Sequence, residues 1–223
     1  MVYSKQETVK DNSLIVHPGI RGCLEFCGIK DGVEIHHDGD LPARSGLGSS
    51  SSFAVGMLLA LHGMRHRMPT KKQLADEAIH VEQVLLKENV GIQDQIFAAH
   101  GGFQAIEIAK GVDYYYTVSP VILPPDFRNE LEKSVLLGFT GITRIASGVA
   151  KEQVEKMERK DSTASEIFGI AKEAMSTLRK GPSIAELGKL LHQSWLCKRQ
   201  LGAGVSTGTL DEIYDAAIRC GAY

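Results

Sequence analysis

A turn rich in glycine and serine leads directly into an apolar helical pattern, and this junction limits the possible folds more than any other stretch. The turn reads GLGSSSS from Gly46 to Ser52. From about Ser50 to His66 the apolar residues recur at the spacing of a mostly buried helix, namely at Phe53, Val55, Met57, Leu58, Leu61 and Met64. The helix therefore begins within the turn, where small side chains leave its first N–H groups open.

A helix start of this kind is suited to an anion. Its free N–H groups and the helix dipole attract negative charge, and Gly46 and Gly48 let a phosphate approach the backbone closely. The pattern is not a Walker A loop, because no lysine follows Gly48, and it lacks the third glycine of the dinucleotide fingerprint. From the residues alone, two interpretations stay open: a phosphate site, and a serine-rich N-cap on a core helix.

The composition is that of an ordinary globular protein. The 223 residues are 43% hydrophobic and 23% charged, and the net charge of −2 gives no electrostatic reason to expect a nucleic-acid partner. No window is long and apolar enough to span a bilayer, and the polar N-terminal residues lack the apolar region of a signal peptide. We therefore expect a cytoplasmic protein whose cysteines are reduced packing residues, at Cys23, Cys27, Cys197 and Cys220.

Helical and strand patterns follow one another without strict βαβ order, which predicts an α+β fold. Strands are expected from Gly32, at 103–109, at 113–123 and, as a buried strand, at 133–141. Helices are expected at 17–30, 50–66, 68–86, between the glycines at 91 and 101, at 144–159, 163–179 and 183–201, and from 210 onward.

Two local signals mark boundaries in this pattern. Thr70 followed by Gln73 is typical of a capping box at a helix start. The Pro124-Pro125 pair indicates a boundary between a domain at 1–124 and another at 125–223.

Two motifs resemble the GHMP kinases, a family named for galactokinase, homoserine kinase, mevalonate kinase and phosphomevalonate kinase. One is Glu82 on a helix, followed by the segment GIQDQ that begins at Gly91. The segments at 138–147 and 192–201 resemble the heptose kinases of this family, which phosphorylate D-glycero-D-manno-heptose 7-phosphate at its anomeric position. The other motif is the phosphate loop, which matches in order at Pro42, Gly46, Leu47, Gly48, Ser49 and Ser50.

The resemblance implies a two-domain GHMP kinase fold, with a ribosomal protein S5 domain 2-like N-terminal part and a ferredoxin-like C-terminal part. It covers the chain from about residue 13. Family members begin with a segment rich in Pro, Arg, Gly and Asp and carry a late glycine-rich segment, and this sequence contains neither. We therefore expect an incomplete fold, cut at both ends, that forms a homodimer or pairs with a complementing fragment.

The resemblance also implies cofactors. Pro42 and the loop residues 46–51, Ser51 included, would hold the phosphates of ATP. Ser50 and Glu82 would bind Mg²⁺, which prefers oxygen ligands, with Ser49 as the alternative to Ser50.

Asp94 would accept the proton of the attacking sugar hydroxyl. The residues alone favour a different interpretation, in which Asp94 caps a helix; the GIQDQ context favours the base.

Residues for the sugar or its 7-phosphate are expected where the strand pattern at 133–141 gives way to a helix, since an arginine there can grip a phosphate with two hydrogen bonds. These residues are Thr140, Gly141, Thr143 and Arg144, with Lys198 as a further contact. The alternatives are a helix cap with a surface arginine, and a solvated lysine.

The expected activity is phosphorylation of heptose 7-phosphate to the 1,7-bisphosphate, in the synthesis of nucleotide-activated heptose for surface polysaccharide. One alternative is a remnant or interaction module that retains ATP binding without turnover. Another is a kinase of the same family that acts on a galactose-like or fucose-like sugar.

Overall fold

The computed structural model describes residues 6–30, 32–39, 46–109, 115–140, 161–181, 183–202 and 204–223. The chain divides into two compact units, and the division falls between Pro120 and Val121. It lies close to the boundary expected at Pro124, although the assignment of two GHMP kinase domains stays a prediction. Each unit is described by itself below.

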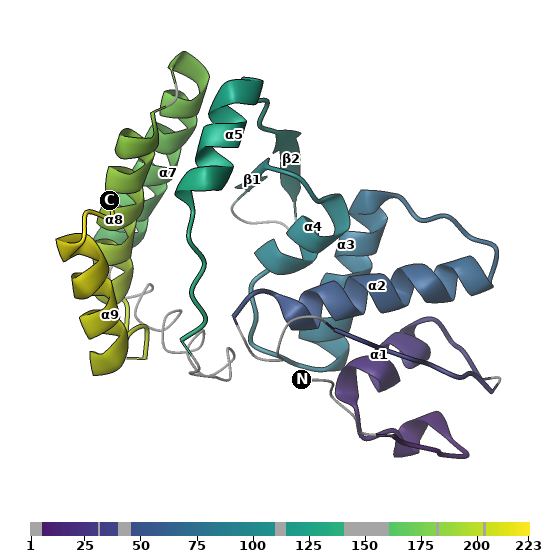
Figure 1. The fold of residues 1–223 in the computed structure, drawn as a ribbon. Helices are drawn as coiled ribbons and strands as arrows, with labels where there is room; N and C mark the ends of the chain where they lie inside the picture. Colours follow the sequence, from purple (N-terminus) through teal and green to yellow (C-terminus); the bar gives the residue numbers. More distant parts are fainter. Residues whose placement is uncertain are drawn as a thin grey trace. The chain divides into compact units, whose positions relative to one another are not determined.

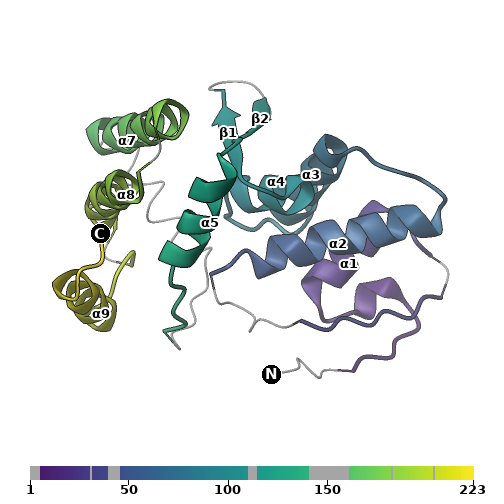
Figure 2. The ribbon, with the colours of Figure 1, turned by 45° about the horizontal axis from the view of Figure 1, so that its top comes forward.

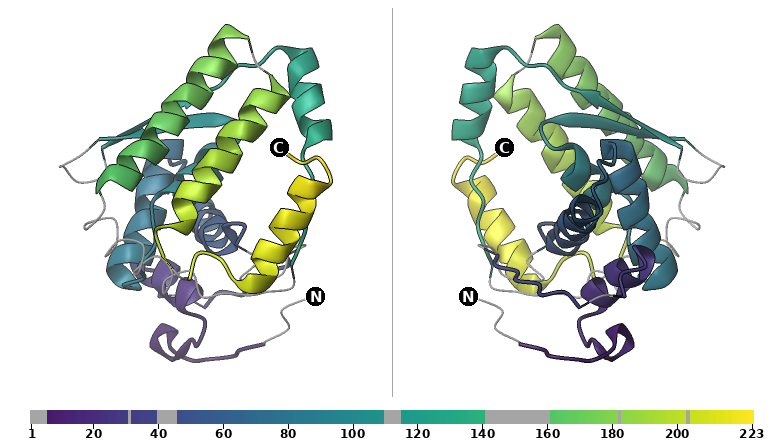
Figure 3. Two further views of the ribbon diagram at one scale, coloured as in Figure 1. Left: turned by 90° about the vertical axis from the view of Figure 1, so that its left-hand side faces the viewer. Right: turned by 90° about the vertical axis from the view of Figure 1, so that its right-hand side faces the viewer.

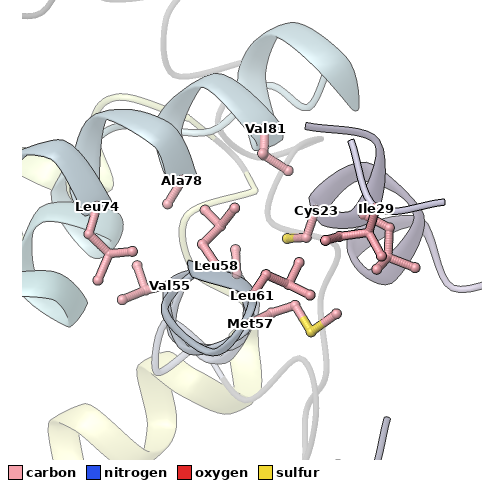
Figure 4. Close-up of a cluster of buried hydrophobic side chains, with 11 residues drawn as sticks. Cys23, Ile29, Val55, Met57, Leu58, Leu61, Leu74, Ala78 and Val81 are labelled. Atoms are coloured by element: carbon pink, nitrogen blue, oxygen red, sulfur yellow. The ribbon is translucent and has the colours of Figure 1, made fainter. Parts of the chain in front are cut away.

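The first unit is built around one long helix, α2 (Ser49–Met64), which packs beside its neighbours in sequence (Figures 1 and 2). Leu58 and Leu61 of α2 are fully or almost fully buried, between Cys23 on one side and Leu74 and Ala78 on the other (Figure 4). The surrounding elements are η1 (Asn12–Leu14), α1 (Pro18–Phe26), α3 (Lys71–Ile79), the π-helical turn η2 (His80–Leu85) and α4 (Gln93–His100).

A smaller cluster holds α4 against α3 and a two-stranded hairpin. The strands β1 (Gln104–Ile108) and β2 (Tyr116–Pro120) pair antiparallel, with Ile106 opposite Val118. The buried side chain of Tyr116 packs with Ile96 of α4. Its hydroxyl donates to Asp76 Oδ1 at 2.8 Å, which fastens the hairpin to α3. The position of α4 is therefore set by buried contacts on two sides.

Most sequence-based expectations for this unit are confirmed. The helices begin and end close to the expected positions, both strands of the hairpin form, and Thr70 caps α3 by accepting from the Gln73 N–H at 3.1 Å. The Gln73 side-chain amide donates to Glu77 Oε1 at 2.8 Å.

The strand expected from Gly32 is wrong. Val33 and Ile35 pack against the core, as their alternation with polar residues predicted, but residues 32–39 form no ladder. A strand is stabilised by hydrogen bonds to a neighbour, and the described part of the chain places no strand beside this segment. The pattern therefore predicted burial correctly and secondary structure incorrectly.

The second unit is helical in its described residues. Here α7 (Asp161–Lys180) and α8 (Ile184–Arg199) lie side by side (Figure 3). The hydroxyl of Tyr214 lies 2.5 Å from His192 Nδ1, and Arg199 pairs with Asp211 at 3.0 Å, so α9 (Gly208–Arg219) is tied to α8. These helices match the last three expected, whereas the helix expected at 144–159 lies outside the described residues.

The strand expected at 133–141 is also wrong. The helix α5 (Pro125–Ser134) begins at the proline pair and takes up the first residues of that segment. The apolar residues that follow are exposed rather than buried, and Leu136 is 95% accessible. The described residues of this unit contain no strand to pair with them, so the apolar run has no ladder to join.

Two further expectations concern packing and membranes. Cys23 and Cys197 are buried and Cys27 is half-buried, but Cys220 is exposed, so the packing role expected for all four cysteines is wrong there. Within the described ranges, every helix is too short or too polar to cross a bilayer.

Candidate active site

The start of α2 is left open by its own sequence. Gly46 and Gly48 adopt left-handed backbone angles, with φ of 79° and 68°, which glycine reaches without the strain that a side chain brings. Gly48 is the N-cap residue and has no side chain, so no side-chain oxygen at that position caps the first turn. The N–H groups of the first turn therefore remain available to a negatively charged ligand.

The hydroxyl groups of this turn contact a buried carboxylate. Ser50 Oγ donates to Glu82 Oε1 and Ser51 Oγ donates to Glu82 Oε2, both at 2.9 Å. The Gln95 side-chain amide also donates to Oε2. Only 2% of Glu82 is exposed. Three segments distant in sequence thus meet at one carboxylate.

Glu82 is directed toward α2 by an irregular helical turn. After Ile79 the helix widens to a π-helical turn, in which the Leu86 N–H donates to Val81 O at 2.9 Å, five residues back. Val81 remains in the core while its neighbour Glu82 faces the serines. Single π-helical turns are rare and often occur at functional sites. The helical periodicity of the sequence gave no indication of this one.

Asp94 lies against the glycine-rich turn. It is an exposed residue in the first turn of α4, whose N-cap is Ile92. A Cβ atom added to Gly48 would lie 3.3 Å from Asp94 Oδ2. Glycine at 48 therefore serves both the left-handed backbone and the close approach of a carboxylate. Asp94 is not the cap residue of α4, so the simple N-cap interpretation does not apply.

The charge of Glu82 has no cationic partner among the residues that the structure describes; the donors described above are neutral. The negative charge of Glu82 contributes to the raised pKa of two nearby groups. Burial, with a contribution from Glu82, raises the pKa of the Glu88 carboxyl. Burial, followed by Cys27 and Glu82, raises the pKa of the Cys23 thiol to about 12. A buried carboxylate next to a hydroxyl oxygen is a donor set that fits a hard cation such as Mg²⁺.

A cavity of about 650 Å³ extends along α2 from Ser49 to Met64. One wall is the segment 33–39, and the other is a face of α2 that carries Ser49 and Ser52 near its start. Phe53 lines it, with the His37 ring edge-on at 4.9 Å. The volume lies in the range of small-molecule sites, and its mixture of apolar walls and a few hydroxyls is typical of them.

The structure brings together only some of the residues expected at the site. Ser50 and Ser51 contact Glu82 and Asp94 lies beside Gly48, whereas Ser49 lines the cavity. Leu47 is exposed and also lines the cavity.

Two of the residues expected to bind the sugar lie in the second unit. Thr140 and Lys198 are exposed residues of the second unit, and Lys198 lies in the last turn of α8. The remaining expected positions lie outside the described residues, at Pro42, Gly141, Thr143 and Arg144.

Sequence reasoning missed the part played by two side chains. Gln95 was recognised as part of the GIQDQ segment but was given no role, and Ser51 was assigned only to the phosphate loop. Both are buried against Glu82 Oε2. The available signal was a glutamine directly after a candidate base. The hydrogen-bond partner of its amide lies 13 residues away, and no local sequence pattern links the two residues.

The chain is similar in sequence to known kinases. Residues 16–102 match the family model for the GHMP kinases N terminal domain, and this range contains the turn at 46–52, Glu82 and Asp94. The chain is 31% identical over 192 residues to the D-glycero-alpha-D-manno-heptose 7-phosphate kinase of Campylobacter jejuni, covering 85% of this chain and 56% of that protein. It is 29% identical over 192 residues to the L-fucokinase/L-fucose-1-P guanylyltransferase of Bacteroides fragilis, covering 82% and 20%.

The fold has a counterpart among solved structures. A crystal structure of mevalonate kinase superposes with a TM-score of 0.63 at 21% identity, over 94% of this chain and 64% of that one. The expected α+β fold of the GHMP kinase type is thereby confirmed. The chain spans about half the length of the heptose kinase, 56%. Residues 16–102 match the GHMP kinases N terminal domain, and the chain is similar to kinases of that family in sequence and in fold.

Proposed function

We propose that the chain is a kinase that transfers the γ-phosphoryl group of ATP to the anomeric hydroxyl of D-glycero-D-manno-heptose 7-phosphate. The observation that carries the proposal is the pairing of the buried Glu82 carboxylate with Ser50 at 2.9 Å, directly beside a helix start that has no side-chain cap. Phosphoryl transfer depends on positioned phosphates, charge compensation and an oriented nucleophile. The site has a candidate group for each.

The first turn of α2 would bind the triphosphate. Its N–H groups and the positive end of the helix dipole favour negative charge, and Gly46 and Gly48 let phosphate oxygens approach the backbone. The cavity beside Ser49 and Phe53 would take the nucleoside, since it adjoins the same helix start. ATP would then lie with its base against apolar walls and its phosphates at the turn.

Ser50 and Glu82 would hold Mg²⁺. Their oxygen atoms come from different helices and already lie within hydrogen-bond distance, so a cation between them needs only small movements. When bound, Mg²⁺ offsets the charge of the transferring phosphoryl group. Ser51 would keep the second Glu82 oxygen in place from the buried side.

Asp94 would act on the sugar. Its carboxylate lies beside Gly48, where the γ-phosphate would end, and its exposed position leaves room for a substrate. As the anomeric oxygen attacks, its proton passes to Asp94, a bond forms from that oxygen to the γ-phosphorus, and the bond to the β,γ-bridging oxygen breaks. The products are the sugar 1,7-bisphosphate and ADP.

The identity of the sugar is supported by similarity to the heptose kinase at 31% identity. We propose Thr140, Gly141, Arg144 and Lys198 as contacts of the sugar or its 7-phosphate. A second candidate substrate is L-fucose, because the bifunctional fucokinases of Bacteroides fragilis and Arabidopsis thaliana match at 29% and 25% identity.

The test is phosphoryl transfer from Mg·ATP to heptose 7-phosphate and, separately, to L-fucose, with the product measured by mass spectrometry. Asp94→Asn should reduce kcat by about 10²- to 10⁴-fold, the usual contribution of a general base, and leave the KM for ATP almost unchanged. Asp126→Asn removes an exposed carboxylate from the first turn of α5 and is the matched control. It should not change kcat.

Each other outcome has a distinct meaning. Full activity of Asp94→Asn would remove the base role. Product from L-fucose alone would select the second substrate. Absence of product from both sugars, with Mg·ATP still raising the Tm, would identify a chain that binds ATP without turnover.

A further inference from the structure

The two oxygen atoms of the Glu82 carboxylate have different surroundings. Oε1 accepts from Ser50, which is exposed at the start of α2. Oε2 accepts from Ser51 and Gln95, which are 6% and 0% exposed. One oxygen thus faces the open side of the site, and the other is held from within the protein.

We propose that Gln95 is a positioning residue for Glu82. Its amide holds Oε2, so that Oε1 stays directed toward Ser50 and the cation. This inference rests on the proposed function, because it assigns the cation-binding side of the carboxylate to Oε1. Groups that hydrogen-bond to metal ligands fix their orientation, and their loss commonly weakens metal binding by about 10- to 100-fold.

The orientation of the Gln95 amide follows from its partners. Glu82 Oε2 is an acceptor, so the amide nitrogen must face it; the reverse orientation would set two acceptors against each other. The other end, Gln95 Oε1, is buried and has no hydrogen-bond partner within the described residues. A buried acceptor without a hydrogen-bond partner is destabilising. An apolar side chain of the same length would avoid that cost, so the contribution of Gln95 lies in its N–H group.

Gln95 also links the carboxylate to the candidate base. Asp94 directly precedes it on α4 and lies against Gly48. Ile96, the next residue, is fully buried in the cluster that fastens α4 to α3 and the hairpin. Three consecutive residues thus contact the phosphate-loop glycine, the metal carboxylate and the core. Gln95 thereby fixes Glu82 relative to the helix that carries Asp94.

The test is a Mg²⁺ titration of Gln95→Met, which keeps the length of the side chain and removes its donor. The Mg²⁺ concentration for half-maximal ATP turnover should rise by about 10- to 100-fold. The affinity for ADP without Mg²⁺, measured by calorimetry, should change less than about twofold, because Gln95 contacts the carboxylate and not the phosphate loop. Gln93→Met, at an exposed position in the same turn of α4, is the matched control and should not alter the Mg²⁺ requirement.

A merely structural role would lower the Tm of Gln95→Met without changing its Mg²⁺ requirement, and that result would overturn the proposal. If Gln95→Met does not fold, Ser51→Ala removes the other donor to Oε2, and an unchanged Mg²⁺ requirement in that variant would have the same meaning. Failure of the proposed function is recognised separately, in the wild type. If the proposed function is wrong, Mg²⁺ will change neither the ADP affinity nor the turnover of the wild type, and both proposals will be wrong.

Discussion

The starts of α2 and α3 use similar residues in opposite ways. At α3, the Thr70 hydroxyl accepts from the Gln73 N–H at 3.1 Å and so closes the first turn. At α2, the hydroxyls of Ser50 and Ser51 point to Glu82, and the cap position holds Gly48. One helix uses a hydroxyl to satisfy its own backbone, whereas the other uses hydroxyls to bind a carboxylate and leaves its backbone donors open.

The difference separates a helix start that is stabilised by a side-chain cap from one that leaves its first N–H groups open. A side-chain cap contributes about 1 kcal/mol, which α2 forgoes. The loss is offset by the burial of Leu58 and Leu61, since a fully buried leucine contributes roughly 1.5–3 kcal/mol. The other capped starts resemble α3, because His17, Ser183 and Thr207 each accept an N–H from the first turn of their helix.

Among these predictions, the largest effect is expected from adding a side chain at Gly48, the N-cap residue of α2. Gly48→Ala would place a Cβ 3.3 Å from Asp94 Oδ2 on a backbone with φ of 68°. The left-handed angle alone costs roughly 1–2 kcal/mol, and the contact forces Asp94 or the loop to shift. Because small misplacements at a reacting centre are costly, turnover should fall by up to about 10²-fold.

Gly28→Ala is the matched control, since φ there is 59° and no atom lies within 4 Å of the added Cβ. Both variants should lose stability, measured as Tm, but only Gly48→Ala should lose activity. Equal activity of the two variants would show that the approach of Asp94 to Gly48 is not needed for the reaction.

Removing one hydroxyl from each helix start should have different effects at α3 and at α2. Thr70→Ala should lower stability by about 1 kcal/mol, or roughly 2–4 °C in Tm, with unchanged turnover. Ser50→Ala should raise the Mg²⁺ requirement about tenfold, because it removes the exposed oxygen beside Glu82 Oε1. Thermal unfolding and Mg²⁺ titrations of both variants check this. An unchanged Mg²⁺ requirement in Ser50→Ala, or a raised one in Thr70→Ala, would contradict the comparison.

The smallest expected effect concerns the imidazole cap of α1. Burial lowers the pKa of His17, an effect that Glu7 opposes and His37 reinforces, and its Nδ1 accepts from the Ile20 N–H at 3.2 Å. Only the neutral ring can accept this bond. Its contribution is therefore complete above the unfolded pKa of about 6.5 and is lost as the pH falls below it, because the unfolded state binds the proton first.

The measurement is the Tm of the wild type and of His17→Asn between pH 7.5 and 5.5. Asparagine can cap the helix without titrating, so the wild type should lose about 1 °C more than the variant. Burial also lowers the pKa of His100, but that contribution is common to both proteins. Parallel Tm curves would show that His17 makes no pH-dependent contribution.

Local patterns predicted the helices and the helix starts well. Apolar spacing located α2 and the helix at 68–86, and Thr70 with Gln73 marked a cap that the structure contains. The two apolar patterns that were wrong, from Gly32 and at 133–141, were both interpreted as strands. A helix satisfies its backbone within one segment, whereas a strand needs a partner elsewhere in the chain. No local pattern can supply that partner.

The sequence by itself determined the chemistry available at the site: two glycines that permit left-handed turns, a row of hydroxyls at a helix start, and two acidic residues in the motif that follows. Only the tertiary structure decided that Ser50 rather than Ser49 contacts Glu82, that Gln95 holds the other oxygen, and that Asp94 lies against Gly48. The physical reason is that a buried carboxylate is kept in place by donors from whichever segments the core brings near it. These donors come from positions 31, 32 and 13 residues away, a separation that only packing can bridge.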